Sequence, residues 1–335
     1  MTYNAAPHLM IASPSHPRLA KLSVASLALT LIVIVWGAYV RASGSGAGCG
    51  SHWPKCNGEV IPLQPSIKTI IEFTHRAQTG ILGIAIVLLV LGVFRVSGRG
   101  SFARKAVTAS VILLISESLI GAALVIFELV AHDASMKRVL SMSLHLTNTL
   151  LLLAAIAATT WSLFDQPAPA GNRKISVGLV TIVVSFVAIG TTGAIAALGD
   201  TLYPAASLSA GMAQEMSKTA SLILKLRPLH PLVAVVGSAV IVTSVRLIAR
   251  FANHHETKRW AILAQGATIA QLVLGIVNLV SLAPTWLQLT HLAMAETTWL
   301  LLVGFGLSAL RPGGVRANPP GWAASTDAPP PTSAR

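Results

Sequence analysis

Eight apolar segments, each about 20 residues long, dominate this chain of 335 residues. A segment of that length crosses the hydrocarbon of a bilayer as an α-helix, because a helix satisfies its own backbone hydrogen bonds there. Apolar residues make up 53% of the sequence and charged residues only 10%, far less charge than a soluble domain carries. We therefore expect an all-α integral membrane protein. The predicted spans are residues 20–40, 72–94, 104–127, 139–163, 174–197, 228–249, 259–282 and 287–310.

The net charge of +13 follows the predicted topology. If both termini are cytoplasmic, the inner segments carry fifteen of the 24 Lys and Arg residues, as the positive-inside rule expects. No basic stripe with interleaved aromatic residues occurs, so we exclude nucleic-acid binding. Residues 1–19 lack the apolar core of a signal peptide and are predicted to be a cytoplasmic tail. Residues 311–335 are rich in Pro, Ala and Ser and are predicted to be a disordered cytoplasmic tail.

Four histidines lie near the starts of the four even-numbered spans: His75, His145, His230 and His291. These spans run from outside to inside in the predicted topology, so the imidazoles collect at one level in the outer third of the membrane. Polar side chains inside a bilayer are costly and indicate function, and imidazole is a strong ligand of iron, copper and zinc. A single such histidine is often a hydrogen-bonding group between helices, but four in register favour metal ligation.

The chain also repeats itself at an offset of about 150 residues. The sequence ESLIG at 117–121 in the third span corresponds to QLVLG at 271–275 in the seventh, and the histidines recur at a similar offset. Since four spans is an even number, both halves point the same way, about an axis along the membrane normal. The predicted architecture is two tandem four-helix bundles related by pseudo-twofold symmetry, residues 20–165 and 166–310, each with one histidine pair facing its interior.

Heme iron is the metal that fits this arrangement best. A structural zinc site needs four tightly grouped ligands, whereas these ligands are divided between two repeats. A di-iron carboxylate site needs Glu-x-x-His motifs on two helices, and only Glu72 with His75 fits. Heme needs one or two axial side chains and a wide apolar slot, so each bundle is predicted to hold one heme. Glu72 could manage protons or position a reacting group at an open iron site, or it could simply be an acid favoured near a helix N-terminus.

The first outer loop, residues 41–71, contains the only two cysteines, Cys49 and Cys56. On the outer face they can be oxidised, and the gap of six residues between them, with Gly and Pro, permits a disulfide. Two interpretations stay open: a structural staple, or a redox-sensitive clamp over the first heme site.

Four other charged side chains lie within the spans or at their outer ends. Arg41 and Arg76 are on the outer side, where they could pair with heme propionates or snorkel to the interface. Glu117 and Glu296 are acids within spans, and each could hydrogen-bond to a heme propionate or to a neighbouring helix.

Several of these motifs together resemble the heme A synthase family. The matching residues are GAYVRASGSG from Gly37, the Cys49–Cys56 loop with Trp53 and Pro54, and EFTHR over 72–76, in that order. The similarity covers nearly all eight spans, residues 20–310, and is weaker in the second half. One departure is His52, since the family often has an Asp before Trp-Pro; this puts an acid role for the loop in doubt.

The resemblance implies an oxidoreductase that converts the C8 methyl group of heme O to the formyl group of heme A, for cytochrome oxidase assembly. It implies that His75 and His145 hold the substrate, with Glu72 as the candidate catalytic acid or base. His230 and His291 would ligate a resident heme b that passes electrons.

The expected location is a bacterial cell membrane, with the heme sites toward the outer face. The expected partners are membrane lipid, heme O, a heme O synthase, an electron donor and, as an option, a second copy of the chain. The alternative is a di-heme b-type electron-transfer protein. Transfer across a membrane favours hemes at different depths, so the single level of the four ligands disfavours that alternative.

Overall fold

The computed structural model describes residues 14–251 and 254–312, and the regular secondary structure of this part of the chain is helical apart from one isolated bridge between Cys56 and Glu59. Most of the two predicted tails, 1–19 and 311–335, lies outside the described residues. The described helices are α1 (Pro17–Ala42), α2 (Ile67–Val96), α3 (Phe102–Ile126), α4 (Met136–Leu163), α5 (Arg173–Leu202), α6 (Leu208–Met216), α7 (Leu222–Leu226), α8 (Leu229–Arg250), α9 (His255–Val280) and α10 (Thr285–Ala309).

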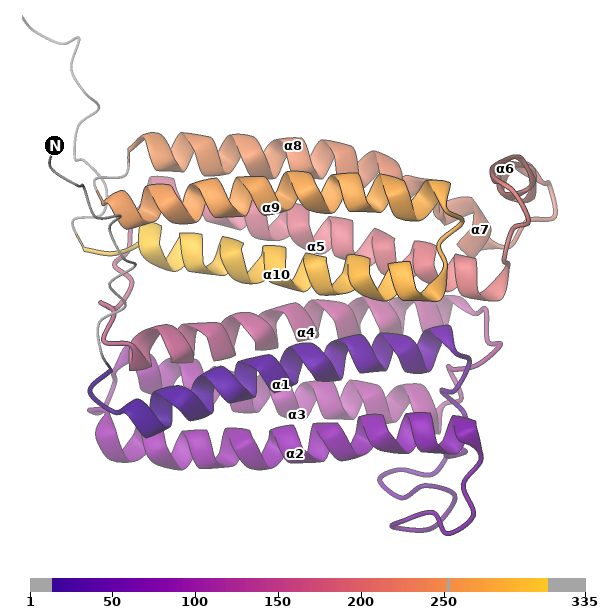
Figure 1. The fold of residues 1–335 in the computed structure, drawn as a ribbon, viewed down its shortest axis with the longest axis horizontal. Helices are drawn as coiled ribbons and strands as arrows, with labels where there is room; N and C mark the ends of the chain where they lie inside the picture. Colours follow the sequence, from indigo (N-terminus) through magenta and orange to yellow (C-terminus); the bar gives the residue numbers. More distant parts are fainter. Residues whose placement is uncertain (1–13, 252–253, 313–335) are drawn as a thin grey trace, which may run out of the picture.

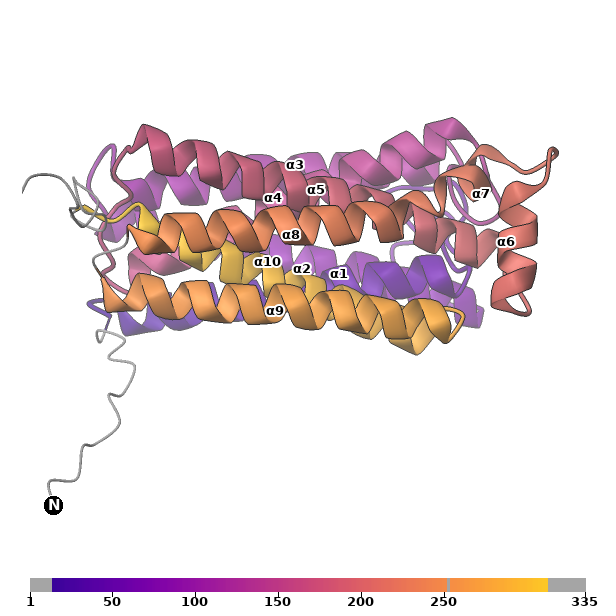
Figure 2. The ribbon, with the colours of Figure 1, turned by 90° about the horizontal axis from the view of Figure 1, so that it is seen from above.

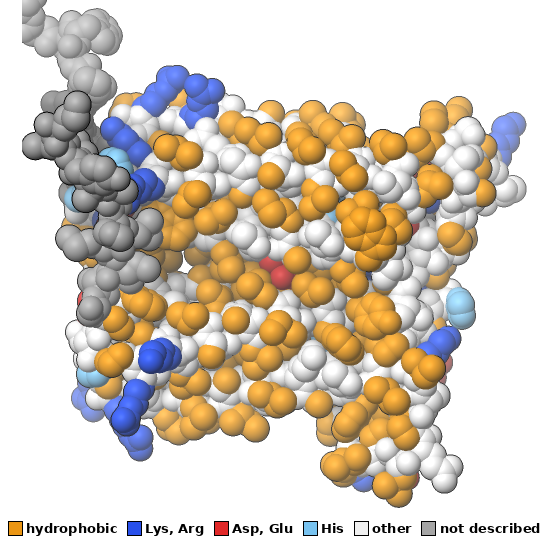
Figure 3. All heavy atoms as spheres, viewed as in Figure 1, with side chains coloured by type: hydrophobic (Ala, Val, Ile, Leu, Met, Phe, Trp, Pro, Cys, Tyr) orange, Lys and Arg blue, Asp and Glu red, His pale blue; other side chains and the backbone are white. Residues whose placement is uncertain are grey.

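Eight helical segments of the described chain are long and apolar enough to cross a membrane, which confirms the predicted all-α membrane class. The segment Leu222–Arg250 combines α7 and α8, and the other seven segments are single helices. Large apolar side chains on their outer surfaces are exposed, for example Ile84 at 65% and Ile112 at 62%. Figure 3 shows such side chains across the middle of one face, with Lys and Arg near its two ends. A surface of this kind suits lipid, because exposed apolar patches of this extent are rare on soluble proteins.

The helix ends are set by capping residues. Ser66, Ser101 and Ser135 precede α2, α3 and α4, and each side chain accepts a hydrogen bond from a backbone N–H of the first turn. Asn172 does the same for α5. Because these caps lie beyond the most apolar residues, the helices extend past the predicted spans, and α2 begins at Ile67 rather than at residue 72.

The long helices form two groups (Figure 1): α1 to α4 in one, and α5, α8, α9 and α10 in the other. Seen from above, they run nearly parallel (Figure 2). The most extensive helix pairs lie within a group, namely α3 with α4, α5 with α8, α9 with α10 and α1 with α2. Contacts of α4 with α5 and α10, and of α1 with α10, join the groups. The predicted division of the chain into bundles of residues 20–165 and 166–310 and their pseudo-twofold relation stay predictions.

A buried tryptophan joins the two groups near the middle of the helices. The indole of Trp299 on α10 donates a hydrogen bond to the carbonyl of Leu150 on α4 at 2.8 Å. Its ring also packs on Phe186 of α5, with the ring centroids 5.0 Å apart. Only 2% of Trp299 is exposed. The helices of the two groups therefore share one continuous core at this level.

The connection between α5 and α8 is more ordered than the sequence indicated. It contains the short helices α6 and α7, and α5 continues to Leu202 instead of ending near residue 197. Arg227, which is 9% exposed, holds this segment together. Its guanidinium donates to Glu215 at 2.7 Å and to Asp200 at 3.3 Å. These polar contacts between distant residues explain why hydropathy alone did not predict the connection.

Candidate functional site

The four predicted ligand histidines lie toward the same end of the helices. His75, His145 and His291 are in the first three turns of α2, α4 and α10, and His230 is in the first turn of α8. All four helices begin at the end of the molecule that also carries α6 and the first long loop (Figure 1). The long loop and α6 therefore lie at the same end of the molecule as the histidines.

The histidines are divided between the two helix groups. His75 on α2 and His145 on α4 lie in the first group, and His230 on α8 and His291 on α10 lie in the second. In the described part of the chain no three His, Cys, Asp or Glu side chains come together as a metal-ion site. A heme requires only two axial side chains, so the pairs match that requirement.

Each imidazole packs against a glycine of the preceding long helix in its group. The pairs are Gly37 with His75, Gly121 with His145, Gly193 with His230, and Gly275 with His291. At three of these glycines an added Cβ would lie 2.9–3.0 Å from the histidine Cε1, which is tighter than nearly all Cβ contacts in proteins. At Gly121 the same distance is 3.7 Å, an ordinary van der Waals contact. Three imidazoles are thus held tightly by backbone, and the fourth has room.

Two of the histidines have a side-chain oxygen near Nδ1. Thr192 Oγ1 lies 3.3 Å from Nδ1 of His230. Glu117 Oε1 lies 3.4 Å from Nδ1 of His145. When Nδ1 carries the proton and faces an oxygen, Nε2 is left with its lone pair for a metal. Both histidines therefore have the surroundings of an axial ligand.

The other two histidines differ. Gln271 Nε2 lies 3.2 Å from Nδ1 of His291 and donates to the His291 carbonyl at 3.0 Å. Nδ1 of His75 is buried and has no hydrogen-bond partner among the described residues. Two imidazoles per group, half-buried among apolar helices and close to a glycine, fit a heme held by two axial histidines.

A small cavity lies inside the second helix group, beside Gln271. It has a volume of about 60 Å³, and α5, α8, α9 and α10 all contribute to its lining, including Thr298. Ligand pockets usually measure roughly 300–1,000 Å³. The lining side chains must therefore move to admit a group as large as a tetrapyrrole.

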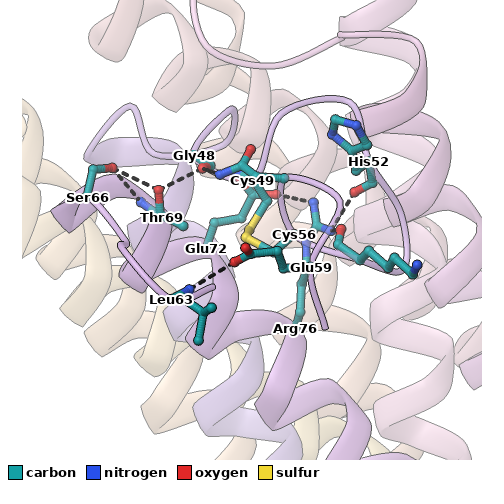
Figure 4. The surroundings of a disulfide bond; sticks show 12 residues. Gly48, Cys49, His52, Cys56, Glu59, Leu63, Ser66, Thr69, Glu72 and Arg76 are labelled. Atoms are coloured by element: carbon teal, nitrogen blue, oxygen red, sulfur yellow. Dashed lines mark hydrogen bonds and ion pairs between the residues drawn. A yellow bond between two sulfur atoms is a disulfide. The ribbon is translucent and has the colours of Figure 1, made fainter. Parts of the chain in front are cut away.

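Glu72 anchors the first long loop to α2 (Figure 4). It is 3% exposed, and its carboxylate accepts a hydrogen bond from the Cys49 backbone N–H at 2.9 Å and another from Arg76 at 2.5 Å. Thr69 adds a bond to the Gly48 carbonyl at 2.8 Å. The loop approaches α2 so closely here that a Cβ on Gly48 would lie 2.4 Å from a backbone oxygen of the helix. Glu72 thus has a structural task beside any chemical one.

Arg76 and a disulfide complete the attachment of the loop. The Arg76 guanidinium donates to the carbonyls of His52 and Lys55, both at 2.7 Å. Cys49 and Cys56 form a disulfide with a Cα–Cα distance of 4.4 Å, which confirms the bond that the sequence permits. The loop is therefore a cross-linked cap tied to the helix that carries His75.

Arg41 reaches from the end of α1 to the second helix group. It donates to the Ala197 carbonyl at 2.7 Å, to Thr201 at 2.6 Å and to Gln288 at 3.1 Å. Arg41 and Arg76 both therefore have protein partners, and their predicted contacts with propionates stay predictions.

The two acids within spans have different surroundings. Glu117 accepts hydrogen bonds from Asn148 at 2.6 Å and from the Thr149 hydroxyl. Sequence reasoning did not predict this cluster, although Asn148 and Thr149 stand one helical turn after His145. Glu296 is 3% exposed, and neither of its carboxyl oxygens has a hydrogen-bond partner within the described ranges.

The family of cytochrome oxidase assembly proteins matches the chain over residues 20–303. A protoheme IX farnesyltransferase of Thermus thermophilus is 38% identical over 309 residues, which cover 91% of this chain and 50% of that protein. The heme A synthase of Alkalihalophilus pseudofirmus is 38% identical over 151 residues, covering 45% of the chain and 48% of the relative. The heme A synthase of Exiguobacterium sibiricum is 35% identical over 173 residues, or 50% of the chain and 57% of the relative. The chain spans about half the length of the curated relatives that it matches.

Proposed function

The chain belongs to the cytochrome oxidase assembly protein family, and we propose that it is a heme A synthase, an oxidoreductase that converts the C8 methyl group of heme O to a formyl group. The observation that carries the proposal is the pair of imidazoles in each helix group, placed at one end of the helices and packed on glycines. Similarity to curated heme A synthases supports the same activity.

His230 and His291 are proposed to hold a resident heme b. When bound there, this heme supplies electrons to the reaction. Ligation by two histidines leaves no iron position open to oxygen, which suits electron transfer. Gly193 on α5 packs against the His230 ring, and Gly275 on α9 packs against the His291 ring. These contacts restrict the orientation of both ligands.

His75 and His145 are proposed to hold the substrate, heme O. Its methyl group would undergo two successive hydroxylations, each of which takes one oxygen atom from an external oxidant such as dioxygen, with two electrons and two protons reducing the second oxygen atom to water. The resulting gem-diol loses water to give the aldehyde. Glu72, one helical turn before His75, is proposed to manage protons in these steps. Its bonds to Cys49 and Arg76 fix the carboxylate beneath the cross-linked loop, which limits its contact with water.

Farnesyl transfer, which the name of the Thermus relative describes, is proposed to reside in the half of that protein that this chain does not match. Transfer from a diphosphate commonly uses Mg²⁺ held by carboxylates and by the substrate phosphates. No two of the 11 acidic residues here are closer than five positions in sequence. Asp200 and Glu215, which do approach in space, are both bonded to Arg227. We therefore propose that a heme O synthase acts before this protein as a partner.

The distribution of basic residues supports a cell-membrane location with both termini cytoplasmic and the histidines toward the outer face. An electron donor then has to reach the His230–His291 site. A second copy of the chain is a further proposed partner.

The activity is tested by expressing the full chain with a source of heme O and extracting the pigments. Heme A, recognised by its formyl group, should form, and Glu72→Gln should abolish it. Glu59→Gln is a matched control, because Glu59 also accepts a backbone N–H in the same loop, from Leu63 at 2.9 Å, but lies on the exposed surface. Full heme A production by Glu72→Gln would refute the role of that carboxylate. Two bound hemes without any formyl product would support the di-heme electron-transfer alternative.

The division between the two sites is tested by heme content. His230→Ala and His291→Ala should lose the resident heme b. If these variants retain it and His75→Ala loses it, the assignment of the two halves is reversed.

A further inference from the structure

Two histidines at corresponding places in the two helix groups have different side chains beside their rings. Glu117 Oε1 lies 3.4 Å from Nδ1 of His145, whereas the amide nitrogen of Gln271 lies 3.2 Å from Nδ1 and 3.3 Å from Nε2 of His291. Each neighbour stands four residues before the glycine that contacts the same imidazole. The same position therefore carries a negative charge in the first group and a neutral amide in the second.

The carboxylate of Glu117 is held in place by donors. Asn148 donates at 2.6 Å to one oxygen, and the Thr149 hydroxyl contacts the other, Oε1, which is the oxygen that faces His145. The same hydroxyl also lies 2.9 Å from the His145 carbonyl, so its single hydrogen is shared between the two acceptors. The side chain of Glu117 is only 15% exposed, so its charge is poorly screened by water.

The contact between Glu117 and His145 is not yet a hydrogen bond. Nδ1 of His145 is buried and has no aligned acceptor among the described residues, so the ring must turn to complete the bond. His145 is also the predicted ligand with the most space at its facing glycine. An added Cβ on Gly121 would lie 3.7 Å from the His145 Cε1, whereas the same distance at the other three histidines is 2.9–3.0 Å. Room to turn and a fixed acceptor thus occur at the same imidazole.

We propose that Glu117 is a positioning residue: it draws the Nδ1–H of His145 into a hydrogen bond when Nε2 binds the iron of a heme in the first helix group. The identification of that heme as substrate rests on the proposed function. A carboxylate behind a ligating histidine makes the imidazole a stronger donor, and a stronger donor stabilises ferric iron relative to ferrous iron. Gln271 gives His291 no such negative charge.

The inference is tested by exchanging the two side chains, with Glu117→Gln in the first helix group and Gln271→Glu in the second. Purified full-length protein is loaded with hemin, and the midpoint potential is measured by absorbance. Glu117→Gln is studied in a His291→Ala background, and Gln271→Glu in a His145→Ala background, so that each titration reports one site. We expect Glu117→Gln to raise the midpoint of the first site and to weaken hemin binding about 10- to 100-fold. Gln271→Glu should lower the midpoint of the second site. Unchanged midpoints in both exchanges would overturn the proposal.

Thr149→Val separates this role from a merely structural one. The substitution keeps the shape of the side chain and removes a donor that competes with His145 for Glu117 Oε1. We expect the midpoint of the first site to fall, opposite to the effect of Glu117→Gln. A purely structural disturbance would change the hemin content without shifting the midpoint potential in opposite directions in the two variants. That result would count against the proposal.

Failure of this inference and failure of the proposed function are distinguishable. The hemin titrations require no oxidation of heme O. If the midpoints shift as expected and no formyl heme is ever produced, the positioning role stands and the synthase activity does not. If formyl heme is produced and the midpoints do not move, the reverse holds.

Discussion

Substitution of Gly37 by Ala should separate heme affinity from helix stability. An added Cβ would lie 2.9 Å from Cε1 and 3.2 Å from Nε2 of His75, so the imidazole must move by several tenths of an ångström. Overpacking of this kind costs about 1–3 kcal/mol. If the overpacking energy is felt only when His75 must take the orientation that binds hemin, hemin affinity drops about 5- to 140-fold, at about 1.4 kcal/mol per factor of ten.

The same substitution favours the helix itself. Ala is about 0.8–1.0 kcal/mol more favourable than Gly in a helix interior, and Gly37 lies inside α1. Gly121→Ala is the matched control, because it faces the partner ligand His145 with an added Cβ at 3.7 Å. It should gain the same helix stability while hemin affinity changes less than about threefold.

Both variants are measured by hemin titration of the Soret absorbance in a His291→Ala background and by thermal unfolding followed with circular dichroism. The reasoning requires Gly37→Ala to lose affinity without a fall in Tm, and Gly121→Ala to keep its affinity. Equal losses in the two variants, or wild-type affinity in Gly37→Ala, would show that the glycine contacts do not position the imidazoles.

Three further substitutions test the loop and the core. Arg76→Lys keeps the charge but removes the guanidinium that donates to the carbonyls of His52 and Lys55. Loss of these bonds should cost about 1.5–3 kcal/mol, so hydrogen exchange of the loop amides should become at least about tenfold faster. Unchanged protection of these amides would contradict the anchoring role of Arg76. Replacing Cys49 and Cys56 together by Ser should destabilise the loop by about 2–3 kcal/mol, seen as faster proteolysis. Unchanged heme A production in this variant would favour a purely structural role for the disulfide, and altered production would favour a redox-sensitive role at the first heme site. Trp299→Phe should cost about 0.5–1.5 kcal/mol, since it removes the buried hydrogen bond from the indole to the Leu150 carbonyl; a Tm equal to wild type would refute that estimate.

The spans could be predicted from sequence because lipid imposes one requirement, apolar length, on every membrane helix. Their ends could not, because a cap such as Ser66 acts through one local hydrogen bond that hydropathy does not register. The segment between α5 and α8 was missed for a related reason. It is held by Arg227, whose partners Glu215 and Asp200 are distant in sequence.

The candidate ligands could be predicted because four histidines in register stand out against apolar sequence. Their surroundings were only partly visible. Gly121 and Gly275 were noticed as a repeat, but contact with an imidazole on another helix depends on how the helices pack. Glu72 was predicted from its spacing to His75, and the bond that it accepts from Cys49 required the path of the loop.

The partners of Arg41 have a consequence for the biosynthesis of the protein. Arg41 lies in the last turn of α1, yet its guanidinium is satisfied by Thr201 on α5 and by Gln288 on α10, the last long helix of the described chain. An arginine without partners is costly at a membrane. Until α5 and α10 have inserted, the cation of α1 therefore lacks these partners, so its full satisfaction depends on helices that are synthesised much later.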